Sequence, residues 1–432
     1  MAFQKVVSRH FDVPQAYDIA VYEQQGGYQA AKKALGMDPA AIIEEVKTSG
    51  LRGRGGAGFP AGMKWSFIPK DSPKPKYLVV NSDESEPGTF KDRKILERDP
   101  HSLIEGIIIA CFAIGSHQAY VYIRGEFNQQ RIHLDDAIKQ AYAKGYLGDN
   151  VMGTGYAVHL STHRGAGAYI CGEETALLES LEGKKGQPRL KPPFPATHGL
   201  FQCPTVVNNV ETIATVPWII ANGADAYASM GTEKSKGTRL MSVSGHCNKP
   251  GVYEIEMGLP FKDFLADHLG GVRNGRQLKA VIPGGSSCPI LTAEEAMGVT
   301  LDPEAIAALG SMAGSGGMMI VDDQTCMVDL LEDLTHFYAH ESCGQCTPCR
   351  EGTDWLYKMV QRIEAGRGTP EDLDTILDIA DNMEGKTICA LAAAATMPTR
   401  SYIKKFRDEF VAHFEHRGCP KKQAKVPAGA GA

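Results

Sequence analysis

Four cysteines constrain the fold of this chain more than any other feature. Cys343, Cys346 and Cys349 follow one another at intervals of three residues, and Cys389 lies 40 residues further on. The C-x2-C-x2-C spacing is typical of ferredoxin-type runs that hold an iron–sulfur cluster. Three thiolates in one turn can hold three corners of a cubic cluster, and Cys389 is the next cysteine along the chain for the fourth iron. The spacing therefore predicts a [4Fe–4S] centre and one-electron transfer.

Two other kinds of site stay open for these cysteines. A structural zinc ion usually takes its ligands as two separated pairs, which fits three equally spaced cysteines poorly. A redox-active disulfide would leave one of the three close thiols unpaired. The cluster is the favoured interpretation of the three.

Length and composition indicate an ordinary globular protein of about two to three domains. The 432 residues are 43% hydrophobic and 22% charged, with a formal net charge of −6. No basic stripe or RNA-binding signature is present, so no nucleic-acid partner is expected. Eleven cysteines are too sparse for a disulfide scaffold in a chain of this length. Those outside the run are expected to be buried side chains or free thiols rather than ligands: Cys111, Cys171, Cys203, Cys247, Cys288, Cys326 and Cys419.

No segment is expected to cross a membrane. The longest apolar run, residues 103–115, contains Glu105 and is too short to span a bilayer. The N-terminus has neither the apolar core of a signal peptide nor the Arg- and Ser-rich composition of a transit peptide. The chain is therefore expected to be cytoplasmic, with any link to the membrane made through partners.

Alternating strands and helices predict an α/β region first. Strands are expected at 77–80, 119–123 and 157–160, and helices at 39–50, 99–114, 128–143, 173–181 and 206–220. Such alternation implies a parallel sheet covered on both faces.

The second half of the chain predicts two further regions. A hairpin at 240–243 and 251–255, a helix at 260–269 and strands at 279–282 and 318–321 suggest a small β-grasp-like domain. Helices at 327–342, 350–364, 370–384 and 398–416 suggest a bundle that carries the cysteines. The expected domain limits are 1–236, 237–326 and 327–418, followed by a disordered tail at 419–432.

The glycine-rich segment Gly53–Gly62 can bring a ligand close to the backbone. Its glycines fit G-x-G-x-x-G, but the preceding segment is predicted to be a helix, so an ordinary Rossmann turn is not expected. Trp65 after Lys64 excludes a Walker A loop. Glycine N–H groups can still donate to an anion or lie against a flat ring. A flexible surface turn stays the alternative.

Two more segments place polar side chains where ligands bind. Residues 81–88 follow a predicted buried strand, and the carboxyl ends of strands in open α/β sheets are ligand sites. A solvated acidic loop is the alternative there. In residues 165–175 a glycine-rich stretch leads into the start of a predicted helix. Glu173 and Glu174 at that start either stabilise the helix dipole or face a nucleotide.

In combination these motifs resemble a known family. Gly53–Gly62, Asn81–Gly88, Tyr169–Thr175, Asn208–Asn209 and the cysteine run are similar to the NADH-binding flavoprotein subunit of respiratory complex I. Diaphorase subunits of NAD-linked hydrogenases and formate dehydrogenases share these motifs. The resemblance covers the chain up to its tail and implies three parts. These are a Rossmann-like α/β domain that binds FMN and NADH, a β-grasp (ubiquitin-like) domain, and an all-α bundle with a [4Fe–4S] cluster.

The resemblance also implies roles for individual residues. Phe59, Phe67 and Phe194 would stack on the adenine of NADH, and Glu86 and Glu174 would meet its polar groups. The cluster ligands would be Cys343, Cys346, Cys349 and Cys389. The full set expected around FMN and NADH is Gly53, Arg54, Gly55, Gly56, Ala57, Gly58, Phe59, Pro60, Ala61, Gly62, Lys64, Phe67, Asn81, Asp83, Glu84, Glu86, Tyr169, Gly172, Glu173, Glu174, Phe194, Asn208, Asn209 and Thr212.

The activity implied is that of the NADH-oxidising part of an NADH:quinone oxidoreductase. Hydride passes from NADH to FMN, and electrons pass singly to the cluster and onward to quinone through a small [2Fe–2S] subunit and a large iron–sulfur subunit. Hydride transfer needs no general base, so Glu86 is expected to act at the reacting centre by orienting ligands. Two alternatives stay open. One is a diaphorase subunit of a hydrogenase or formate dehydrogenase, and the other is a non-catalytic scaffold subunit that is stabilised by structural zinc.

Overall fold

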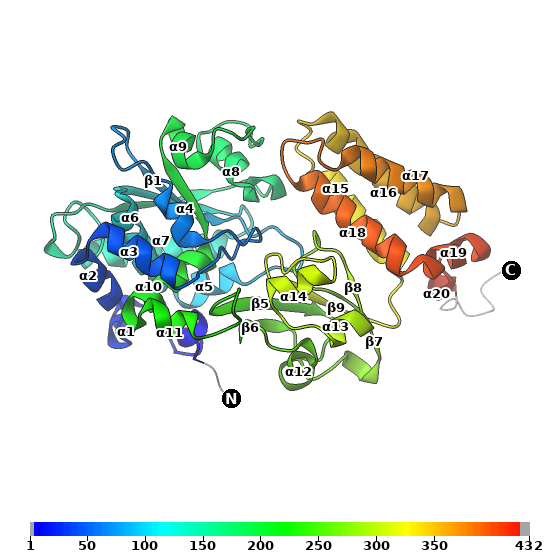
Figure 1. Cartoon of the computed structure of the whole chain (residues 1–432), viewed down its shortest axis with the longest axis horizontal. Helices are drawn as coiled ribbons and strands as arrows, with labels where there is room; N and C mark the ends of the chain where they lie inside the picture. The colour runs from blue at the N-terminus through cyan, green and yellow to red at the C-terminus, as the bar shows by residue number, and fades with distance from the viewer. Residues whose placement is uncertain (1–3, 424–432) are drawn as a thin grey trace.

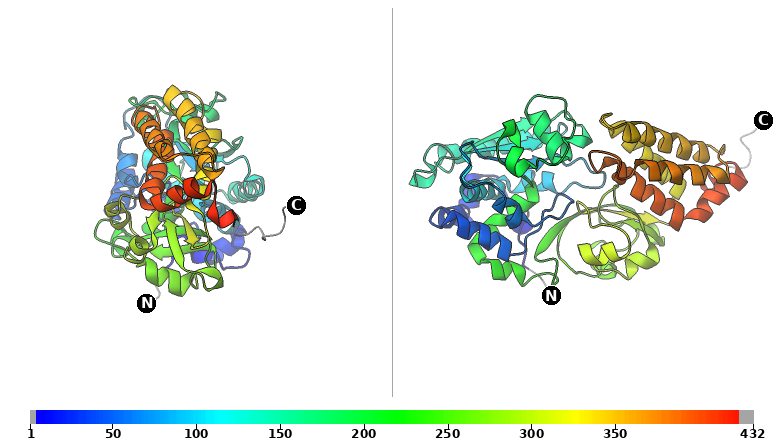
Figure 2. Two further views of the ribbon diagram at one scale, coloured as in Figure 1. Left: turned by 90° about the vertical axis from the view of Figure 1, so that its right-hand side faces the viewer. Right: turned by 45° about the horizontal axis from the view of Figure 1, so that its top comes forward.

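The computed structural model describes residues 4–423, which form three parts (Figure 1). A four-stranded sheet with its helices comes first, a five-stranded sheet follows, and helices complete the chain. The right-hand view in Figure 2 places the C-terminal helices at one end of the molecule, the first sheet with its helices at the other end, and the second sheet below the bundle. The mixed α/β class and the order of these parts agree with the prediction.

The first sheet is parallel throughout. Its strands β1 (Tyr77–Ser82), β2 (Gln118–Ile123), β3 (His159–Arg164) and β4 (Thr205–Asn209) lie in the order β3-β2-β1-β4. Leu78 and Val80 belong to one hydrophobic core, and Val79 between them belongs to another. Both faces of β1 are therefore buried, as parallel sheets require.

Helices cover both faces of this sheet. Helix α6 (Pro100–Ile114) begins where Asp99 accepts a hydrogen bond from the Ser102 N–H at 3.2 Å and Pro100 takes the first helical position. It packs beside α10 (Val210–Asn222), whereas α8 (Glu174–Leu181) joins the core on the opposite face. The other helices of this part are α1 (Ile19–Gln24), α2 (Gln29–Leu35), α3 (Pro39–Thr48), α4 (Ala61–Ser66), α5 (Asp92–Arg98), α7 (Asn128–Ala143), α9 (Pro195–His198), α11 (Ala224–Ala228), η1 (Ser8–His10), η2 (Val151–Gly153), η3 (Tyr169–Gly172) and η4 (Leu200–Gln202).

The prediction of one helix over 206–220 is wrong. Residues 205–209 form β4, and α10 starts only at Val210. Val206 and Val207 are buried in different cores, so this short apolar stretch has the two-sided burial of a central strand. Asn209 then caps α10 by accepting a hydrogen bond from the Glu211 N–H at 2.9 Å.

The second sheet contains the predicted hairpin. Strands β5 (Thr238–Gly245) and β6 (Gly251–Glu256) pair antiparallel, and β9 (Gly317–Asp322) pairs parallel with β5. The strand order is β6-β5-β9-β7-β8, and β8 is a two-residue strand that the sequence did not predict. The remaining elements are β7 (Leu278–Ile282), β8 (Leu291–Thr292), α12 (Phe261–Asp263), the π-helix η5 (Phe264–His268), η6 (Arg273–Gly275), α13 (Ala293–Met297) and α14 (Pro303–Ala308).

The C-terminal part is helical, with two departures from prediction. Residues 391–416 form two helices rather than one at 398–416, because Phe406 between them leaves the helical conformation at φ −126° and ψ 32°. The predicted disordered tail starts at residue 419, whereas residues 420–423 form a helical turn; residues 424–432 lie outside the described residues. The helices are α15 (Met327–Glu341), α16 (Thr347–Glu364), α17 (Pro370–Met383), α18 (Leu391–Lys405), α19 (Arg407–His416) and α20 (Pro420–Gln423).

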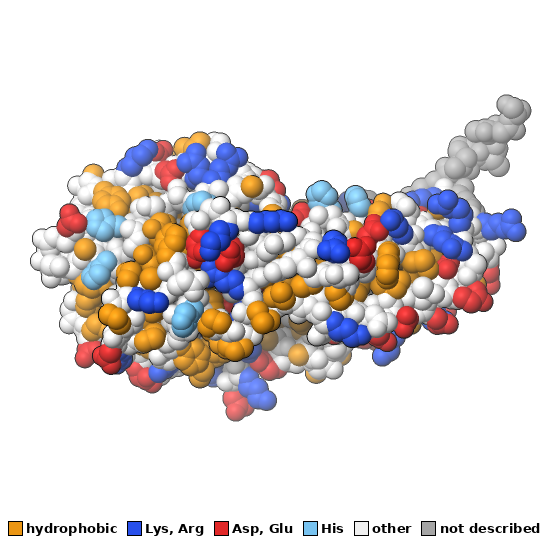
Figure 3. Space-filling view, turned by 90° about the horizontal axis from the view of Figure 1, so that it is seen from above, with side chains coloured by type: hydrophobic (Ala, Val, Ile, Leu, Met, Phe, Trp, Pro, Cys, Tyr) orange, Lys and Arg blue, Asp and Glu red, His pale blue; other side chains and the backbone are white. Residues whose placement is uncertain are grey.

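The expected domain limits at 236/237 and 326/327 stay predictions. Within residues 4–423, none of the helices has both the length and the apolar character needed to cross a bilayer. On the face seen in Figure 3, basic, acidic and apolar side chains are interspersed.

Candidate functional site

A cavity of about 400 Å³ opens where β1 and β4 end. Carboxyl ends of parallel strands are where open α/β sheets bind ligands, and this volume is typical of cofactor sites. Asn81 at the end of β1 donates to the Gly172 carbonyl at 2.8 Å, which joins two walls of the cavity. The predicted residues that line it are Arg54, Gly55, Ala57, Asn81, Asp83, Glu84, Glu86, Tyr169, Gly172, Glu173 and Asn209.

The glycine-rich loop forms one wall of this cavity. It connects α3 to α4, so the structure confirms that a helix and not a strand precedes it. The Gly53 N–H donates to the Phe59 carbonyl at 2.8 Å, which closes the loop on itself. A Cβ on Gly55 would lie 3.2 Å from the Asn209 Cβ, and Gly56 adopts φ +125°, which side chains disfavour. Gly55 therefore allows the loop to approach Asn209 closely, and Gly56 allows a backbone conformation that other residues disfavour.

Arg54 anchors the loop to the second sheet. Its backbone N–H donates to the Thr212 hydroxyl at 2.9 Å, and its guanidinium donates to the Thr238 carbonyl at 2.7 Å. The guanidinium also donates to the Tyr227 hydroxyl at 3.0 Å. Arg54 is 4% exposed and also lines the cavity, where its Nε has no hydrogen-bond partner in the protein.

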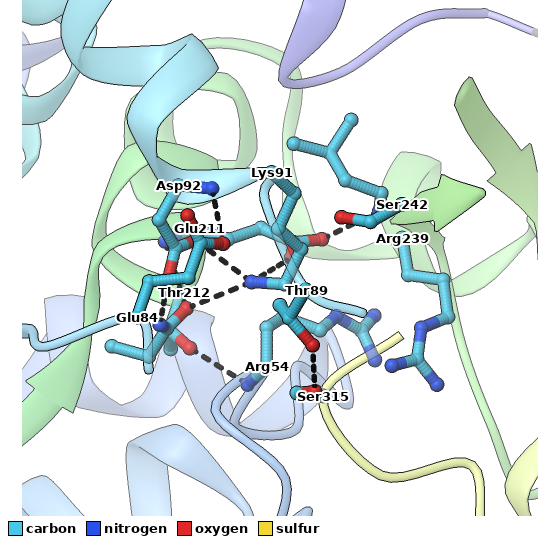
Figure 4. Close-up of polar contacts among 12 residues, drawn as sticks. Arg54, Glu84, Thr89, Lys91, Asp92, Glu211, Thr212, Arg239, Ser242 and Ser315 are labelled. Carbon is cyan, nitrogen blue, oxygen red and sulfur yellow. Dashed lines mark hydrogen bonds and ion pairs between the residues drawn. The ribbon is translucent and has the colours of Figure 1, made fainter. Parts of the chain in front are cut away.

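A buried charge cluster at the cavity joins the predicted Glu84 to Lys91, Asp92 and Glu211, which were not predicted (Figure 4). The Lys91 Nζ lies 2.7 Å from carboxylate oxygens of both Asp92 and Glu211. Burial alone would lower the pKa of Lys91, but these carboxylates outweigh it and raise the pKa. Glu84 accepts from the Asp92 N–H at 2.7 Å, and burial raises the pKa of Glu84. No local pattern marks Lys91 in the sequence, because its partner Glu211 lies far along the chain.

The carboxyl groups after β1 are largely buried. Glu86 accepts from the Tyr169 hydroxyl and from the Ser287 N–H, both at 2.7 Å, and burial raises the pKa of Glu86. Burial also raises the pKa of Asp83 to about 7, and its Oδ1 has no hydrogen-bond partner in the protein. A buried oxygen without a partner fits a ligand that carries hydroxyl donors.

A second group of predicted residues surrounds Glu174 outside the cavity lining. Glu174 pairs with Lys64 at 2.7 Å and with Lys191 at 3.0 Å. Burial raises the pKa of Glu174, but the two ammonium groups lower it by more, so the net shift is downward and the carboxylate is ionised at neutral pH. These ion pairs bring α4, α8 and the segment before Phe194 together.

Three apolar rings are exposed beside these segments, with Phe59 before α4 and Phe67 directly after it. Phe59 and Phe67 lie with ring centroids 6.0 Å apart, and they are 45% and 52% exposed. Phe194 is 58% exposed. Large exposed rings on segments that ion pairs hold together are typical of a surface that stacks on a flat ligand.

The four predicted cluster cysteines meet in one small pocket. Cys343 follows α15, Cys346 caps α16, Cys349 lies in its first turn, and Cys389 precedes α18. All four are free thiols, and the N-termini of α16 and α18 approach the pocket. Helix N-termini favour thiolates and anionic clusters.

The cysteine pocket adjoins the cavity. Ile170, Cys389 and Leu391 line both. A redox group in the cavity and a cluster in the pocket would therefore be separated by shared wall residues only.

Some predicted binding residues lie outside the cavity lining and some lining residues were missed. Asn208 accepts from the Trp65 indole N–H at 2.8 Å and Thr212 holds the Arg54 backbone, so these two support the walls. The predicted residues outside the lining are Gly53, Gly56, Gly58, Phe59, Pro60, Ala61, Gly62, Lys64, Phe67, Glu174, Phe194, Asn208 and Thr212. Those missed are Ser85, Thr89, Lys91, Asp92, Ile170, Ser287, Met312, Ser315, Ala390, Leu391, Ala394 and Met397.

Three family models match successive parts of the chain. They are the Nuo51 FMN-binding domain over residues 46–218, the SLBB domain over 239–308, and the NADH-ubiquinone oxidoreductase-F iron-sulfur binding region over 329–413. The NADH-quinone oxidoreductase F protein of Mycobacterium tuberculosis is 55% identical over 96% of this chain and 94% of its own length. The F protein of Streptomyces coelicolor is 54% identical over 98% and 94%, and the F 2 protein of Rhizobium meliloti is 52% identical over 97% and 99%.

The chain belongs to the family of NADH-quinone oxidoreductase F subunits.

A solved structure related to this chain is a chain of an NAD+-reducing [NiFe]-hydrogenase in the H2-reduced state. It superposes with a TM-score of 0.82 at 38% identity, over 90% of this chain and 64% of the hydrogenase chain. The same kind of hydrogenase in the air-oxidized state gives a TM-score of 0.81 at 38% identity, over 95% of this chain and 67% of the hydrogenase chain.

The residues of this chain fit the cofactors of its family. The cavity has the volume of a cofactor site, a glycine wall and a buried Asp83 oxygen without a partner, which suits the hydroxyl groups of FMN. The pocket offers four free cysteines and no disulfide, which suits a [4Fe–4S] cluster. The assignment of individual residues to FMN, NADH and iron stays a prediction.

Proposed function

We propose that this chain is the NADH-oxidising, FMN- and [4Fe–4S]-carrying subunit of an NADH-quinone oxidoreductase. The observation that carries the proposal is the shared wall of Ile170, Cys389 and Leu391 between the cavity and the cysteine pocket. FMN, when bound, supplies the conversion of a two-electron hydride transfer into single electron transfers. The chain itself must hold the reactants close together and keep water out.

Glu86 is the proposed positioning group at the reacting centre. Its two oxygens accept from the Tyr169 hydroxyl and the Ser287 N–H at 2.7 Å each, which sets the orientation of the carboxyl. A C–H bond broken as hydride leaves no proton for a base to remove. Glu86 therefore orients ligands and sets the local field, and it does not act as a general base.

The exposed rings form the proposed NADH platform. Phe59, Phe67 and Phe194 offer apolar faces for the adenine, and aromatic stacking on a base contributes about 1–3 kcal/mol. Glu174 lies beside Lys64 and Lys191 on the same segments, where a carboxylate accepts from ribose hydroxyls. Binding energy from the adenine end would hold the nicotinamide end in the cavity.

The four cysteines are the proposed ligands of the cluster. Burial raises the pKa of the Cys349 and Cys389 thiols, so a cationic metal is needed to hold them as thiolates. The side-chain set Cys343, Cys346, Cys349 and Cys389 supplies one thiolate for each iron of a cubane.

The partners proposed are a small [2Fe–2S] subunit and a large iron–sulfur subunit of the same complex. The relatives are named as parts of an NADH-quinone oxidoreductase, which supports membership of such a complex. We place the chain in the cytoplasm, peripheral to the inner membrane through these partners, and we expect no nucleic-acid partner.

A second function, the diaphorase subunit of an NAD-linked hydrogenase, is favoured by the hydrogenase superposition. The NADH-quinone oxidoreductase relatives match over nearly their whole length, which favours the first function.

Anaerobic purification of the chain with its partners tests the proposal. Analysis should give about one FMN and about four iron and four sulfide per chain beyond those of the partners. NADH should reduce ferricyanide, and the membrane complex should reduce quinone. A colourless preparation that refuses both flavin and iron would exclude the function, whereas co-purification with a hydrogenase would assign the second one.

A further inference from the structure

A second group of metal-binding side chains lies at the far end of the helical bundle. Cys326, Glu364, His413 and Cys419 each offer one ligand atom, and all four atoms lie within 4.8 Å of one another. They come from the cap of α15, the last residue of α16, α19 and the residue before α20. Residues that lie far apart in sequence, such as Cys326 and Cys419, therefore converge on one point.

The group is closed to solvent. Cys326, His413 and Cys419 are 6%, 2% and 4% exposed, and the Glu364 side chain is 7% exposed. Burying a carboxylate, an imidazole and two thiols together is costly unless they are paired or bind a metal. The site therefore has the burial of a structural metal centre rather than that of an open catalytic one.

The spacing of the ligand atoms fits a tetrahedral ion. The Cys326 Sγ lies 3.5 Å from the His413 Nε2 and 3.9 Å from the Glu364 Oε2. Zinc bond lengths in a tetrahedron give a sulfur–nitrogen separation of about 3.6 Å. The His413 Nε2 and the Glu364 Oε2 are 2.9 Å apart, so in the absence of a metal they share a hydrogen bond.

The outer atoms of two ligands are already engaged. The His413 Nδ1 donates to the Glu409 carbonyl at 2.6 Å, which turns the Nε2 lone pair inward. The Lys422 Nζ lies 3.0 Å from the Glu364 Oε1, which leaves the Glu364 Oε2 facing the group. Such fixed partners behind the ligands are typical of metal sites.

We propose that Cys326, Glu364, His413 and Cys419 bind one Zn²⁺ in a structural site. Two thiolates and an imidazole select zinc over magnesium or calcium, which prefer oxygen ligands. Two thiolates and one carboxylate around Zn²⁺ leave one net negative charge, and Lys422 balances it. The ion ties the end of the described chain to the first turn of α15.

This site is separate from the cysteine pocket. Cys326 precedes the first residue of α15 and Cys343 follows its last, so one 15-residue helix lies between the two sites. A helix of that length spans about 22 Å. Zinc has no redox chemistry, so the ion stabilises the bundle and takes no part in electron transfer.

Metal analysis of the chain in its purified complex tests the proposal. The wild-type chain should hold about one zinc, and Cys326→Ser and Cys419→Ser should each lose most of it while keeping their cluster iron. The matched control Cys247→Ser alters another buried cysteine and should keep both metals. Cys389→Ser should show the reverse pattern, losing cluster iron and keeping zinc.

Wild-type chain that holds no zinc after growth with zinc and purification without chelators would overturn the proposal. So would a disulfide between Cys326 and Cys419 in the mass spectrum of freshly isolated protein. Zinc that is retained at wild-type level in both Ser variants would place the ion elsewhere and also overturn it.

A spectroscopic test does not depend on how the variants fold. Wild-type protein that has been depleted of zinc and loaded with Co²⁺ should show the absorption of tetrahedral cobalt with thiolate ligands, and added Zn²⁺ should remove it. Octahedral cobalt absorption without a thiolate band would overturn the proposal. Because the signal is independent of flavin and of NADH oxidation, its outcome is distinct from that of the proposed function.

Discussion

The Lys91 ammonium lies 2.7 Å from the Glu211 carboxylate, and both side chains are 1% exposed. Lys91 belongs to the loop before α5, whereas Glu211 is in the first turn of α10 and accepts from the Leu240 N–H of β5 at 2.7 Å. The pair therefore links the cavity floor to the second sheet. The largest effect of such a buried pair on stability is seen when one partner is removed, because the other charge is then buried without a counterion.

Replacing Lys91 with Met should destabilise the protein by about 3–5 kcal/mol, because Asp92 and Glu211 would remain buried without a counterion. Urea unfolding of the purified protein measures this, and FMN content should fall with stability. Lys94→Met is the control, since Lys94 pairs with Glu97 where both side chains are partly exposed, and its loss should cost about 1 kcal/mol or less. Equal losses in both variants would contradict the role of the buried cluster.

Local signals predicted much of the fold. Asp99 and Pro100 mark the start of α6 and Gly115 marks its end, because caps depend on neighbouring residues only. The strand at 205–209 was missed because a short apolar run has no periodicity that separates a strand from a helix. Its identity is decided by pairing with β1, which is a contact between residues far apart in sequence.

The candidate site was predicted where its residues form continuous motifs. The glycine loop, the segment after β1 and the cysteine run each carry their pattern within a few residues. Ser287 and Ser315 line the cavity from loops of the second sheet, and nothing near them in sequence indicates a ligand. Cys326 and Cys419 were expected to be non-ligating thiols for the same reason, since only the packed helices bring them together with His413.

Asp83 should make stability depend on pH. Burial raises its pKa to about 7 from an ordinary value of 3.8. A carboxyl whose pKa is higher in the folded chain stabilises the fold fully below its unfolded pKa, and this contribution is lost as pH rises to about 7. Between the ordinary pKa and the raised one, a span of roughly three pH units, the free energy of unfolding should fall by about 4 kcal/mol.

Asp83→Asn is uncharged at every pH, so its stability relative to wild type should increase between pH 4 and pH 7. Urea unfolding of the flavin-free proteins at several pH values measures this difference. The exposed Asp71→Asn variant should show no such trend. A constant difference between Asp83→Asn and wild type would mean that Asp83 titrates normally.

The exposed rings should affect NADH binding more than turnover. Phe59→Ala, Phe67→Ala and Phe194→Ala should each raise the KM for NADH about tenfold, in line with the loss of one stacking contact of about 1.4 kcal/mol. The NADH–ferricyanide assay gives KM and kcat separately, and kcat should change less than KM. Phe201→Ala is the matched control, because Phe201 is 53% exposed but packs on Tyr77. A change in KM for Phe201→Ala as large as for the other three would count against the platform.

Glu174 should set the preference for NADH over NADPH. Its carboxylate is ionised, and a 2′-phosphate about 4 Å away would be repelled by roughly 4 kcal/mol at an effective dielectric constant of 20. Lys64 and Lys191 offset part of this repulsion while they are paired with Glu174. In Glu174→Ala the Lys64 ammonium loses that partner and becomes available to a phosphate, whereas the Lys191 Nζ keeps the Glu173 carboxylate at 2.9 Å.

The kcat/KM for NADPH should therefore rise at least about tenfold in Glu174→Ala, while that for NADH stays level or falls. Glu179→Ala removes a carboxylate from the same helix that pairs with Arg189 instead, and it should leave the ratio of the two cosubstrates unchanged. Raising the ionic strength should reduce the gain in Glu174→Ala, because the freed Lys64 acts on the phosphate through a screened charge interaction. If Glu174→Ala discriminates between NADH and NADPH as strongly as wild type does, selectivity must arise from the shape of the site and not from this carboxylate.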